Sequence, residues 1–384
     1  MCVKKILVVC GDYVYPPNHG GRVDMWNNIC VLHEIGYWIH LICTVKKKPN
    51  DEYISKVKEI VQRLDLIPRK NRVIDMLSSR PLQMTSRRGL RMTSLEAQYD
   101  FMILEGSYGA EILENPILKV AHKILRMQND EAAYFKAMAK AEPSVLRKIY
   151  YLSDAKKFSD IDAELMRYVP NILFLSHDEK KRYEKKYPHL NSYFLPASVA
   201  LKLKQRARNN HTALLIASFF MTNNKEAIKC YFEKIHPQIK LKDYKIIVAG
   251  NSRGAGVKWV EKLARPYHNV EIYDSPKDLT SLYDQASVFV NTMMHGAGVK
   301  LKTVNAIDEG LPVVSTTTGN EGTGLEPERD IIVTDNPSEF AEKITQVLTD
   351  RVIADNLVKN GQRYLRENYD QKKVLRDYLS SFRE

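Results

Sequence analysis

Several features that would mark other classes of protein are scarce or missing in this chain of 384 residues. Its five cysteines form an odd set without the paired spacing of zinc ligands, so neither a disulfide framework nor a zinc site is expected. No apolar run approaches the roughly 20 residues needed to span a bilayer, and the run from Ile6 to Cys10 is too short for a signal peptide. The turn after this run lacks the Gly-x-Gly-x-x-Gly fingerprint, so no nicotinamide or flavin cofactor is indicated. We therefore expect a cytoplasmic protein without a bound cofactor.

Acidic residues are also in the minority: 58 basic residues against 46 acidic ones give a formal net charge of +12. Such a balance suits a polyanionic partner, either a nucleotide diphosphate, an anionic lipid or nucleic acid. Nucleic acid is disfavoured because motifs that interleave aromatic and basic residues are missing. We expect an anionic surface at the inner face of the membrane, carrying a lipid-linked acceptor, as the larger partner. The arginine-rich loop from Ser79 to Thr93 is a candidate for contact with a charged acceptor or lipid.

The chain is longer than the roughly 250 to 300 residues that one hydrophobic core usually serves, so two domains are expected. Short apolar runs alternate with helical patterns, which is typical of α/β domains with parallel sheets. Strands are predicted at residues 6–10, 38–44, 101–104, 122–126, 172–176, 213–217, 245–249, 270–273, 288–291, 313–315 and 331–333. Amphipathic or capped helices are predicted at residues 24–35, 131–169, 224–235, 337–348 and 371–382.

The strand pattern stops near Pro196 and restarts after Asn210, which indicates the crossover between two tandem, Rossmann-like, doubly wound domains. We predict an N-terminal acceptor-binding domain at residues 1–197 and a C-terminal nucleotide-sugar-binding domain at residues 198–365. A last segment, residues 366–384, is expected to pack back on the N-terminal domain. Sheets of this kind bind ligands at the carboxyl ends of their strands, so the two domains should face a common cleft.

Two glycine-containing turns are candidates for anion binding. The first, His19-Gly20-Gly21-Arg22, lies between the first strand and the first helix, where the backbone and the helix N-terminus can approach a phosphate. The second runs from His295 to Thr316 and contains Gly296-Ala297-Gly298-Val299-Lys300-Leu301-Lys302 before a short helix. Lys302 is the favoured phosphate-binding cation with Lys300 next, although both lysines and Arg22 could instead be solvated surface charges.

The second turn resembles the nucleotide-sugar site of the GT-B fold retaining glycosyltransferases, a family that builds capsules, lipopolysaccharides and glycolipids. The matching positions are Gly296, Gly298, Lys302, Ala306, Gly310-Leu311-Pro312-Val313-Val314, Thr316, Gly319 and Glu321-Gly322. The segment from Arg126 to Glu131 is similar to an Arg-x-His-Asn-x-Glu segment that lines the cleft in the family. These segments occur in the family's order over most of the chain.

The resemblance implies a retaining transfer from a nucleotide sugar to a saccharide or lipid-linked acceptor. Catalytic roles are expected for Lys302, Lys300, Arg126 and Gln128, and stabilisation of the leaving diphosphate by the two lysines would require no metal. Donor contacts are expected from Gly20, Gly21, Arg22, Gly296, Ala297, Gly298, Val299, Asn305, Gly319 and Glu321. His19, Asn129 and Glu131 are expected on the acceptor side, and no metal site is expected because an Asp-x-Asp motif is missing from the relevant place.

The sequence also departs from the family pattern. Ala297 and Asn305 stand where many relatives carry a pair of glutamates, and an asparagine binds ribose hydroxyls less strongly than a carboxylate. Gln128 replaces the usual histidine, so a general base is not available there. Two alternatives therefore stay open, a sugar-nucleotide epimerase or hydrolase of the same fold and a catalytically silent nucleotide-sugar-binding protein.

Overall fold

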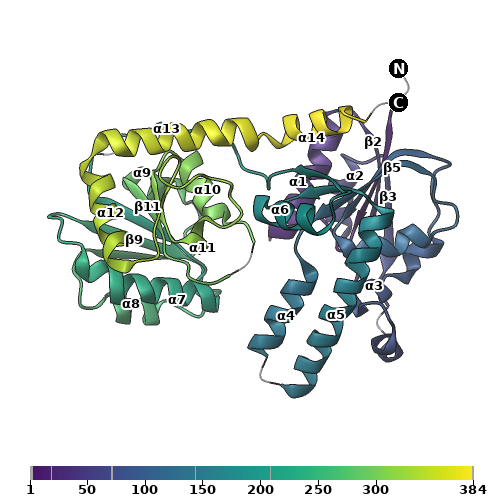
Figure 1. Ribbon diagram of the computed structural model, residues 1–384, viewed down its shortest axis with the longest axis horizontal. Coiled ribbons are helices and arrows are strands. Elements are labelled where there is room, and N and C mark those ends of the chain that lie inside the picture. The colour runs from purple at the N-terminus through teal and green to yellow at the C-terminus, as the bar shows by residue number, and fades with distance from the viewer. Residues whose placement is uncertain are drawn as a thin grey trace. The chain divides into compact units, whose positions relative to one another are not determined.

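Two parallel β-sheets organise the chain, and each sheet belongs to a separate unit (Figure 1). The computed structural model describes residues 3–18, 20–70, 72–142, 144–207, 209–296 and 298–382. The first unit comprises Met1–Ser198 together with Gln371–Glu384, and the second comprises Val199–Asp370. The α/β fold class predicted from the sequence is confirmed.

The first unit contains a seven-stranded sheet in the order β3-β2-β1-β4-β5-β6-β7. Its strands are β1 (Lys5–Cys10), β2 (Trp38–Val45), β3 (Arg63–Pro68), β4 (Tyr99–Glu105), β5 (Val120–Met127), β6 (Asn171–Phe174) and β7 (Asn191–Phe194). Its helices are α1 (Gly20–Glu34), α2 (Asp51–Lys58), α3 (Leu82–Thr85), α4 (Glu131–Ala141), α5 (Val145–Tyr168), α6 (His177–Lys186) and α14 (Gln371–Ser380), with 3₁₀ turns η1 (Val73–Leu77), η2 (Arg88–Met92) and η3 (Ser107–Glu114).

The sheet of the first unit is covered on both faces, as parallel sheets require. One core cluster joins β1 and β2 to Ile29 of α1, Val57 of α2 and Leu375 of α14. The other lies on the opposite face and includes Met84 of α3 and Leu165 of α5. The strands in the middle of the sheet are therefore mostly apolar, which is why β1, β2 and β4 could be predicted from the sequence.

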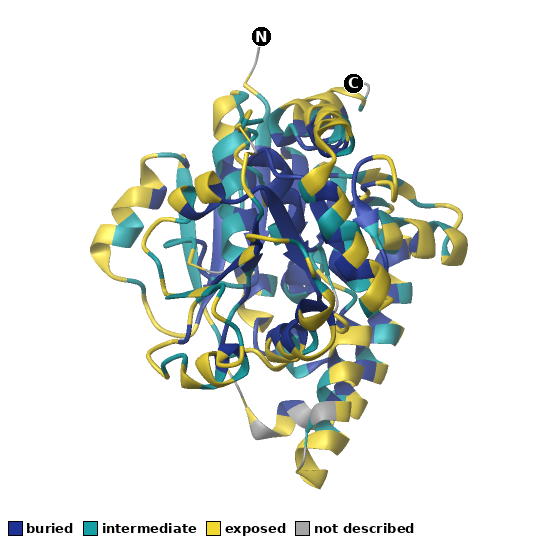
Figure 2. Ribbon diagram, turned by 90° about the vertical axis from the view of Figure 1, so that its left-hand side faces the viewer, coloured by how far each residue is buried: buried dark blue, intermediate teal, exposed yellow. Residues whose placement is uncertain are grey.

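The second unit contains a six-stranded sheet in the order β10-β9-β8-β11-β12-β13. Its strands are β8 (Thr212–Ile216), β9 (Lys245–Gly250), β10 (Val270–Asp274), β11 (Val288–Asn291), β12 (Val313–Ser315) and β13 (Ile332–Val333). Its helices are α7 (Thr222–Cys230), α8 (Lys258–Ala264), α9 (Thr280–Gln285), α10 (Leu301–Asp308), α11 (Thr317–Asn320), α12 (Pro337–Thr349) and α13 (Arg351–Asn368), with a π-helical turn η4 (Tyr231–Ile235) and a 3₁₀ turn η5 (His236–Gln238). Figure 2 shows the strands buried beneath helices whose outer faces are exposed.

Two edge strands were missed by the sequence analysis. Strand β3 alternates charged and apolar residues, since Arg63 and Asp65 interrupt its apolar positions. Strand β7 is short and polar, with the sequence Asn-Ser-Tyr-Phe. Each lies at an edge of the seven-stranded sheet, where one side of the strand is free of neighbours, so a continuous apolar run is not needed.

The segment from Ser79 to Thr93, expected as a contact for a charged acceptor or lipid, is not an open loop. It folds as α3 and η2, and each of its arginines interacts within the unit. Arg87 is 1% exposed, Arg80 and Arg91 pair with Glu111, and Arg88 pairs with Asp75. Among the helices in the described part of the chain, none has the length and apolar character needed to cross a membrane.

A buried ion pair connects the first helix to the centre of the first sheet. Arg126, at the end of β5, is 0% exposed and contacts both carboxylate oxygens of Asp24 on α1, at 2.9 Å and 3.1 Å. The same guanidinium donates to the carbonyl oxygens of Leu195 and Pro196, which follow β7. Helix α14 joins this region through a 2.6 Å hydrogen bond from Gln371 to Asn28.

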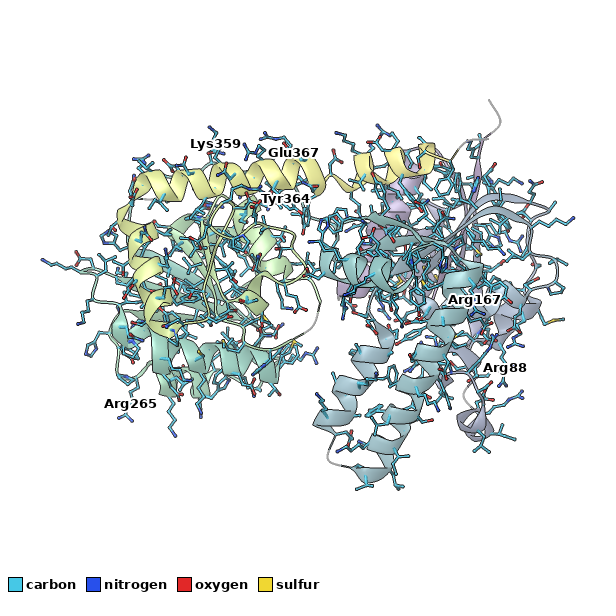
Figure 3. All side chains as sticks on the ribbon, in the orientation of Figure 1. Arg88, Arg167, Arg265, Lys359, Tyr364 and Glu367 are labelled. Carbon is cyan, nitrogen blue, oxygen red and sulfur yellow. The ribbon has the colours of Figure 1, made fainter. Side chains whose placement is uncertain are left out.

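We predict that Arg126→Met lowers the free energy of unfolding by about 3–5 kcal/mol, because it leaves the carboxylate of Asp24 buried without its cation. Urea denaturation measures this difference. The matched control is Arg167→Met on α5, whose side chain lies on the outside of the first unit (Figure 3) and should change stability by less than about 0.5 kcal/mol. Equal effects of the two substitutions would show that the pair is not needed.

Candidate functional site

Each unit has a pocket at the carboxyl ends of its strands. In the second unit, the pocket follows β8 and β9 and has a volume of about 330 Å³. It is lined by Ile216, Ala217, Ser218, Asn224, Gly250, Asn251, Ser275, Pro276, Leu279 and Lys302. The strand order changes direction between β8 and β11, and such a switch point is where open α/β sheets bind ligands. Gly250 is required for close packing there, since a Cβ atom would lie 1.8 Å from the carbonyl oxygen of Ala217.

Lys302 is the cation of this pocket. It stands in the first turn of α10, and its amino group donates a 2.9 Å hydrogen bond to Oδ1 of Asn224. Burial lowers the pKa of Lys302 to about 8, and the nearby charge of Lys300 contributes in the same direction. Within the described ranges Lys302 has no carboxylate partner, so its charge is available to an anion in the pocket.

Lys300, predicted as the second choice after Lys302 for the phosphate-binding cation, has a different environment from Lys302. Its side chain is buried at 5% exposure, and Nζ donates to the carbonyl oxygens of Gly296 at 2.9 Å and Gly298 at 2.6 Å. Nζ also lies 3.1 Å from Oε2 of Glu321. Lys300 therefore stabilises the glycine turn by hydrogen bonds to its carbonyl oxygens, and its charge is paired with Glu321.

The glycine turn itself needs two glycines for their backbone conformation. Gly296 has φ 129° and Gly298 has φ 85°, values that other residues adopt only with strain. Gly319 is buried beside β12 for another reason, since a Cβ atom there would lie 2.3 Å from Oγ of Ser315. Val299 is partly buried, Asn305 is exposed on α10, and Ala297 lies outside the described residues.

The pocket of the first unit is larger, with a volume of about 890 Å³. It opens where β1, β2, β4 and β5 end, and the N-terminus of α1 forms one of its sides. Gly21 and Arg22 line it, whereas Gly20 begins α1 and is exposed. Arg22 is bound to Oδ2 of Asp12 by hydrogen bonds of 2.9 Å and 3.2 Å, so its charge is already paired. His19 lies outside the described residues.

A buried polar network forms the floor of this larger pocket. Gln128 donates to Asp24 at 2.9 Å and to Glu105 at 3.0 Å, and Asn28 donates to Glu105 at 2.9 Å. Burial raises the pKa of Glu105 to about 7, and the carboxylate of Asp24 contributes to the rise. Arg126 lies behind this floor and does not line the pocket, so it can act on a ligand only through Asp24 and Gln128.

Two predicted acceptor-side residues line the wall of the same pocket. Glu131, at the start of α4, accepts a 2.6 Å hydrogen bond from the hydroxyl of Tyr108, and Asn129 lies two residues before it. Burial raises the pKa of Glu131 to about 7. Gln128, Asn129 and Glu131 are thus brought together with Glu105 and Tyr108, which the sequence analysis did not identify. Glu105 directly follows the strand predicted at residues 101–104 and is the last residue of β4, and this place at a strand end was the signal that could have identified it.

Other pocket residues that sequence reasoning missed share one property: each lies at most two residues after the end of a strand. Lys46 and Lys47 come after β2, Arg69 after β3, and Ser218 and Asn251 shortly after β8 and β9. The part of the chain that the structure describes contains no group of three or more His, Cys, Asp or Glu side chains arranged to hold a metal ion.

The chain is similar in sequence to one described family and to one curated protein. Residues 210–350 match the family model described as "Glycosyl transferases group 1". An "Uncharacterized 44.6 kDa protein in cps region" of Klebsiella pneumoniae is 33% identical over 394 residues, and the alignment covers 100% of both proteins.

Solved structures with low sequence identity share the fold. The Anabaena protein Alr3699/HepE, in complex with UDP and glucose, superposes with a TM-score of 0.63 at 11% identity, covering 99% of this chain and 100% of that one. The apo form of the lipopolysaccharide outer core galactosyltransferase WaaB gives a TM-score of 0.66 at 12% identity, covering 98% of this chain and 99% of that one. A glycosyltransferase from Rickettsia africae gives 0.64 at 11% identity, with coverage of 99% and 98%. The predicted GT-B fold is confirmed by these likenesses.

Proposed function

The chain belongs to the group 1 glycosyltransferases, and we propose that it moves a sugar from a nucleotide-sugar donor to a saccharide or lipid-linked acceptor with retention of anomeric configuration. The relative from a cps region and the likeness to WaaB support a place in cell-surface polysaccharide or glycolipid synthesis. A nucleotide-sugar donor is supported by HepE, whose structures hold UDP with glucose and UDP-glucose.

The observation that carries this proposal is the placement of Lys302. It puts a cation without a carboxylate partner at the switch point of the second sheet, beside the close approach of Gly250 to Ala217. A nucleoside diphosphate gains negative charge as it leaves, and a fixed cation in a partly dry site stabilises that charge. We assign Lys302 this catalytic role, with Lys300 and Glu321 as positioning residues that hold the glycine turn.

The proposed reaction joins the oxygen of an acceptor hydroxyl to the anomeric carbon of the donor sugar. The bond between that carbon and the diphosphate oxygen breaks, and the diphosphate departs with the electron pair. In front-face attack, the acceptor proton passes to the departing phosphate oxygen, so no separate base is required. Glu131, Asn129 and Gln128 would orient the acceptor in the larger pocket, with Arg126 acting through Asp24.

We also propose that the first unit rests on an anionic membrane surface through α5. Near the start of this helix Val145, Leu146 and Ile149 are 70%, 81% and 59% exposed, and Arg147 and Lys148 lie between them. Figure 1 shows α4 and α5 running together away from the sheet of their unit. Exposed apolar side chains flanked by cations fit the interface of an anionic bilayer.

We predict that Lys302→Ala reduces turnover by about 100-fold or more, the usual scale for loss of one preorganised charge stabiliser. Mass spectrometry measures it as the release of nucleoside diphosphate from a panel of UDP-, GDP- and dTDP-sugars, or of the monophosphate from CMP-sugars. The assays are run in EDTA so that no divalent ion replaces the lost charge, and the unsubstituted enzyme is expected to be active there. A near-normal rate for the variant would remove Lys302 from the mechanism, and a wild-type enzyme inactive in EDTA would contradict a metal-free reaction.

The same assays distinguish the alternative functions. If the donor is epimerised or hydrolysed without an acceptor, the protein is an epimerase or a hydrolase and not a transferase. Binding without turnover of any donor would indicate a catalytically silent protein.

The pKa of Lys302 predicts an alkaline limit to activity. Because the cationic form is present below about pH 8 and is lost above it, kcat/KM for the donor should fall as the pH rises through about 8. Lys302→Arg keeps its charge at higher pH, so any activity it retains should show the fall at a higher pH. An unchanged pH profile in this variant would assign the fall to another group.

We predict that the double substitution Leu146→Asp and Ile149→Asp weakens binding to vesicles of anionic lipid by about tenfold or more, since both side chains would lose apolar burial. Sedimentation with phosphatidylglycerol vesicles measures binding, with phosphatidylcholine vesicles for comparison. Val352→Asp on α13 is the control, because Val352 is equally exposed at 70% but lies in the second unit. Equal binding by all three proteins would exclude α5 as the contact.

A further inference from the structure

The pocket of the first unit has an uneven distribution of charge. Its acidic residues lie at the ends of β1 and β4 and at the start of α4, and all are engaged: Asp12 by Arg22, Glu105 by Asn28 and Gln128, and Glu131 by Tyr108. Of its remaining cations, Lys46, Lys47 and Arg69 come from the other half of the sheet, where β2 and β3 end, and Arg87 comes from the segment between α3 and η2. The pocket thus has a carboxyl side and a cationic side.

The cationic side is held together by the sheet. Val45 and Pro68, the last residues of β2 and β3, are partners in the parallel register, and the backbone amide of Arg69 donates to the carbonyl of Val45 at 2.8 Å. This pairing places Arg69 next to Lys46 and Lys47, which directly follow β2. The cationic side is therefore fixed by strand register and does not depend on a mobile loop.

Two guanidinium groups meet on this side without a carboxylate between them. Arg87 donates to the carbonyl oxygen of Gly11 at 2.6 Å and 3.1 Å, and Arg69 reaches the same oxygen at only 3.5 Å. The pKa of Arg87 is lowered to about 9, mainly by burial and next by the charge of Arg69. Two cations that share one neutral acceptor repel each other, and an anion placed between them would relieve the repulsion.

Hydrogen-bonding capacity is also left over in this pocket. The Nε atom of Arg69 is buried and has no hydrogen-bond partner among the described residues, and the same holds for the hydroxyl of Ser107 on the pocket wall. Lys46 and Lys47 make no ion pair with any residue that the structure describes. Buried polar atoms are normally paired, so atoms of this kind in a pocket point to a polar ligand.

We propose that this cationic side, formed by Arg69, Arg87, Lys46 and Lys47, is a subsite for an anionic group on the acceptor. The acceptor is then a sugar that carries a phosphate or a carboxylate, with its reacting hydroxyl toward the carboxyl side of the pocket. A planar guanidinium binds either group through paired hydrogen bonds, which is the geometry that arginine provides and lysine does not. That the bound sugar is an acceptor rests on the proposed function. That the subsite binds an anionic group does not depend on the proposed function.

Binding titrations of the full chain test the subsite with three probes: glucose 1-phosphate, glucuronic acid and glucose. At least one anionic sugar should bind about tenfold or more tightly than glucose, because hydrogen bonds to a charged group are stronger than those that neutral glucose can make. Arg69→Gln and Lys47→Met should each remove about tenfold of that affinity and leave glucose unaffected. Lys48→Met is the matched control, because this neighbouring lysine pairs with Asp51 and does not line the pocket.

The outcomes separate the sources of the anion. A preference for glucose 1-phosphate indicates the phosphate of a lipid-linked acceptor, and a preference for glucuronic acid indicates an acidic sugar within the saccharide. Equal affinity for all three probes, or an Arg69→Gln variant that binds the anionic sugars normally, would overturn the inference. The readout is binding, so it decides the matter even if no donor is turned over. If donors are turned over and acceptor charge has no effect, the inference fails while the proposed function stands.

Discussion

The buried ion pair between Asp24 and Arg126 is the interaction on which the first unit depends. It fixes α1 against the end of β5, and the same guanidinium holds the chain where it leaves β7. Asp24 then accepts from Gln128, and Asn28, one turn further along α1, connects Glu105 to Gln371 of α14. The floor of the larger pocket is therefore an extension of a structural network. This explains why burial there is compatible with polar side chains, since nearly every donor and acceptor has a partner.

In the second unit, a single buried lysine holds the backbone of the candidate site in place. Its glycine turn has little side-chain packing of its own, and Lys300 supplies what is missing by binding two carbonyl oxygens of the turn and the carboxylate of Glu321. With Lys300 used in this way, the charge directed at the pocket belongs to Lys302. Two lysines that are two residues apart thus have separate tasks, one in positioning the turn and one in meeting a ligand.

The sequence was sufficient for the α/β fold class and for the glycine turn, because both depend on local patterns. Continuous apolar runs predict buried parallel strands, and the turn from Gly296 to Lys302 matches a family motif. Strand β3 could not be predicted, since an edge strand with Arg63 and Asp65 has no continuous apolar run. Missing β3 also meant missing Arg69, whose place beside Lys46 follows from the register of two strands that are separate in sequence. The burial of Arg126 was likewise beyond sequence, because its partner Asp24 is 102 residues away.

The positive net charge of the chain can be assigned to particular places once the cations that form ion pairs are set aside. Many cations are engaged by acids, as Arg80 and Arg91 are by Glu111, or Lys202 and Arg206 by Glu309. Among the described residues, cations without an acidic partner remain at the carboxyl ends of both sheets, with Lys302 in one pocket and Arg69 beside Arg87 in the other. A surplus that served only solubility would have no reason to collect where strands end and side chains are partly buried, because desolvation there destabilises a charge. Hydrogen bonds from Lys302 to Asn224 and from Arg87 to the carbonyl oxygen of Gly11 offset part of this energetic cost. Bound anions would offset more of it, and a reaction between a nucleotide sugar and a charged acceptor would bring one anion to each pocket.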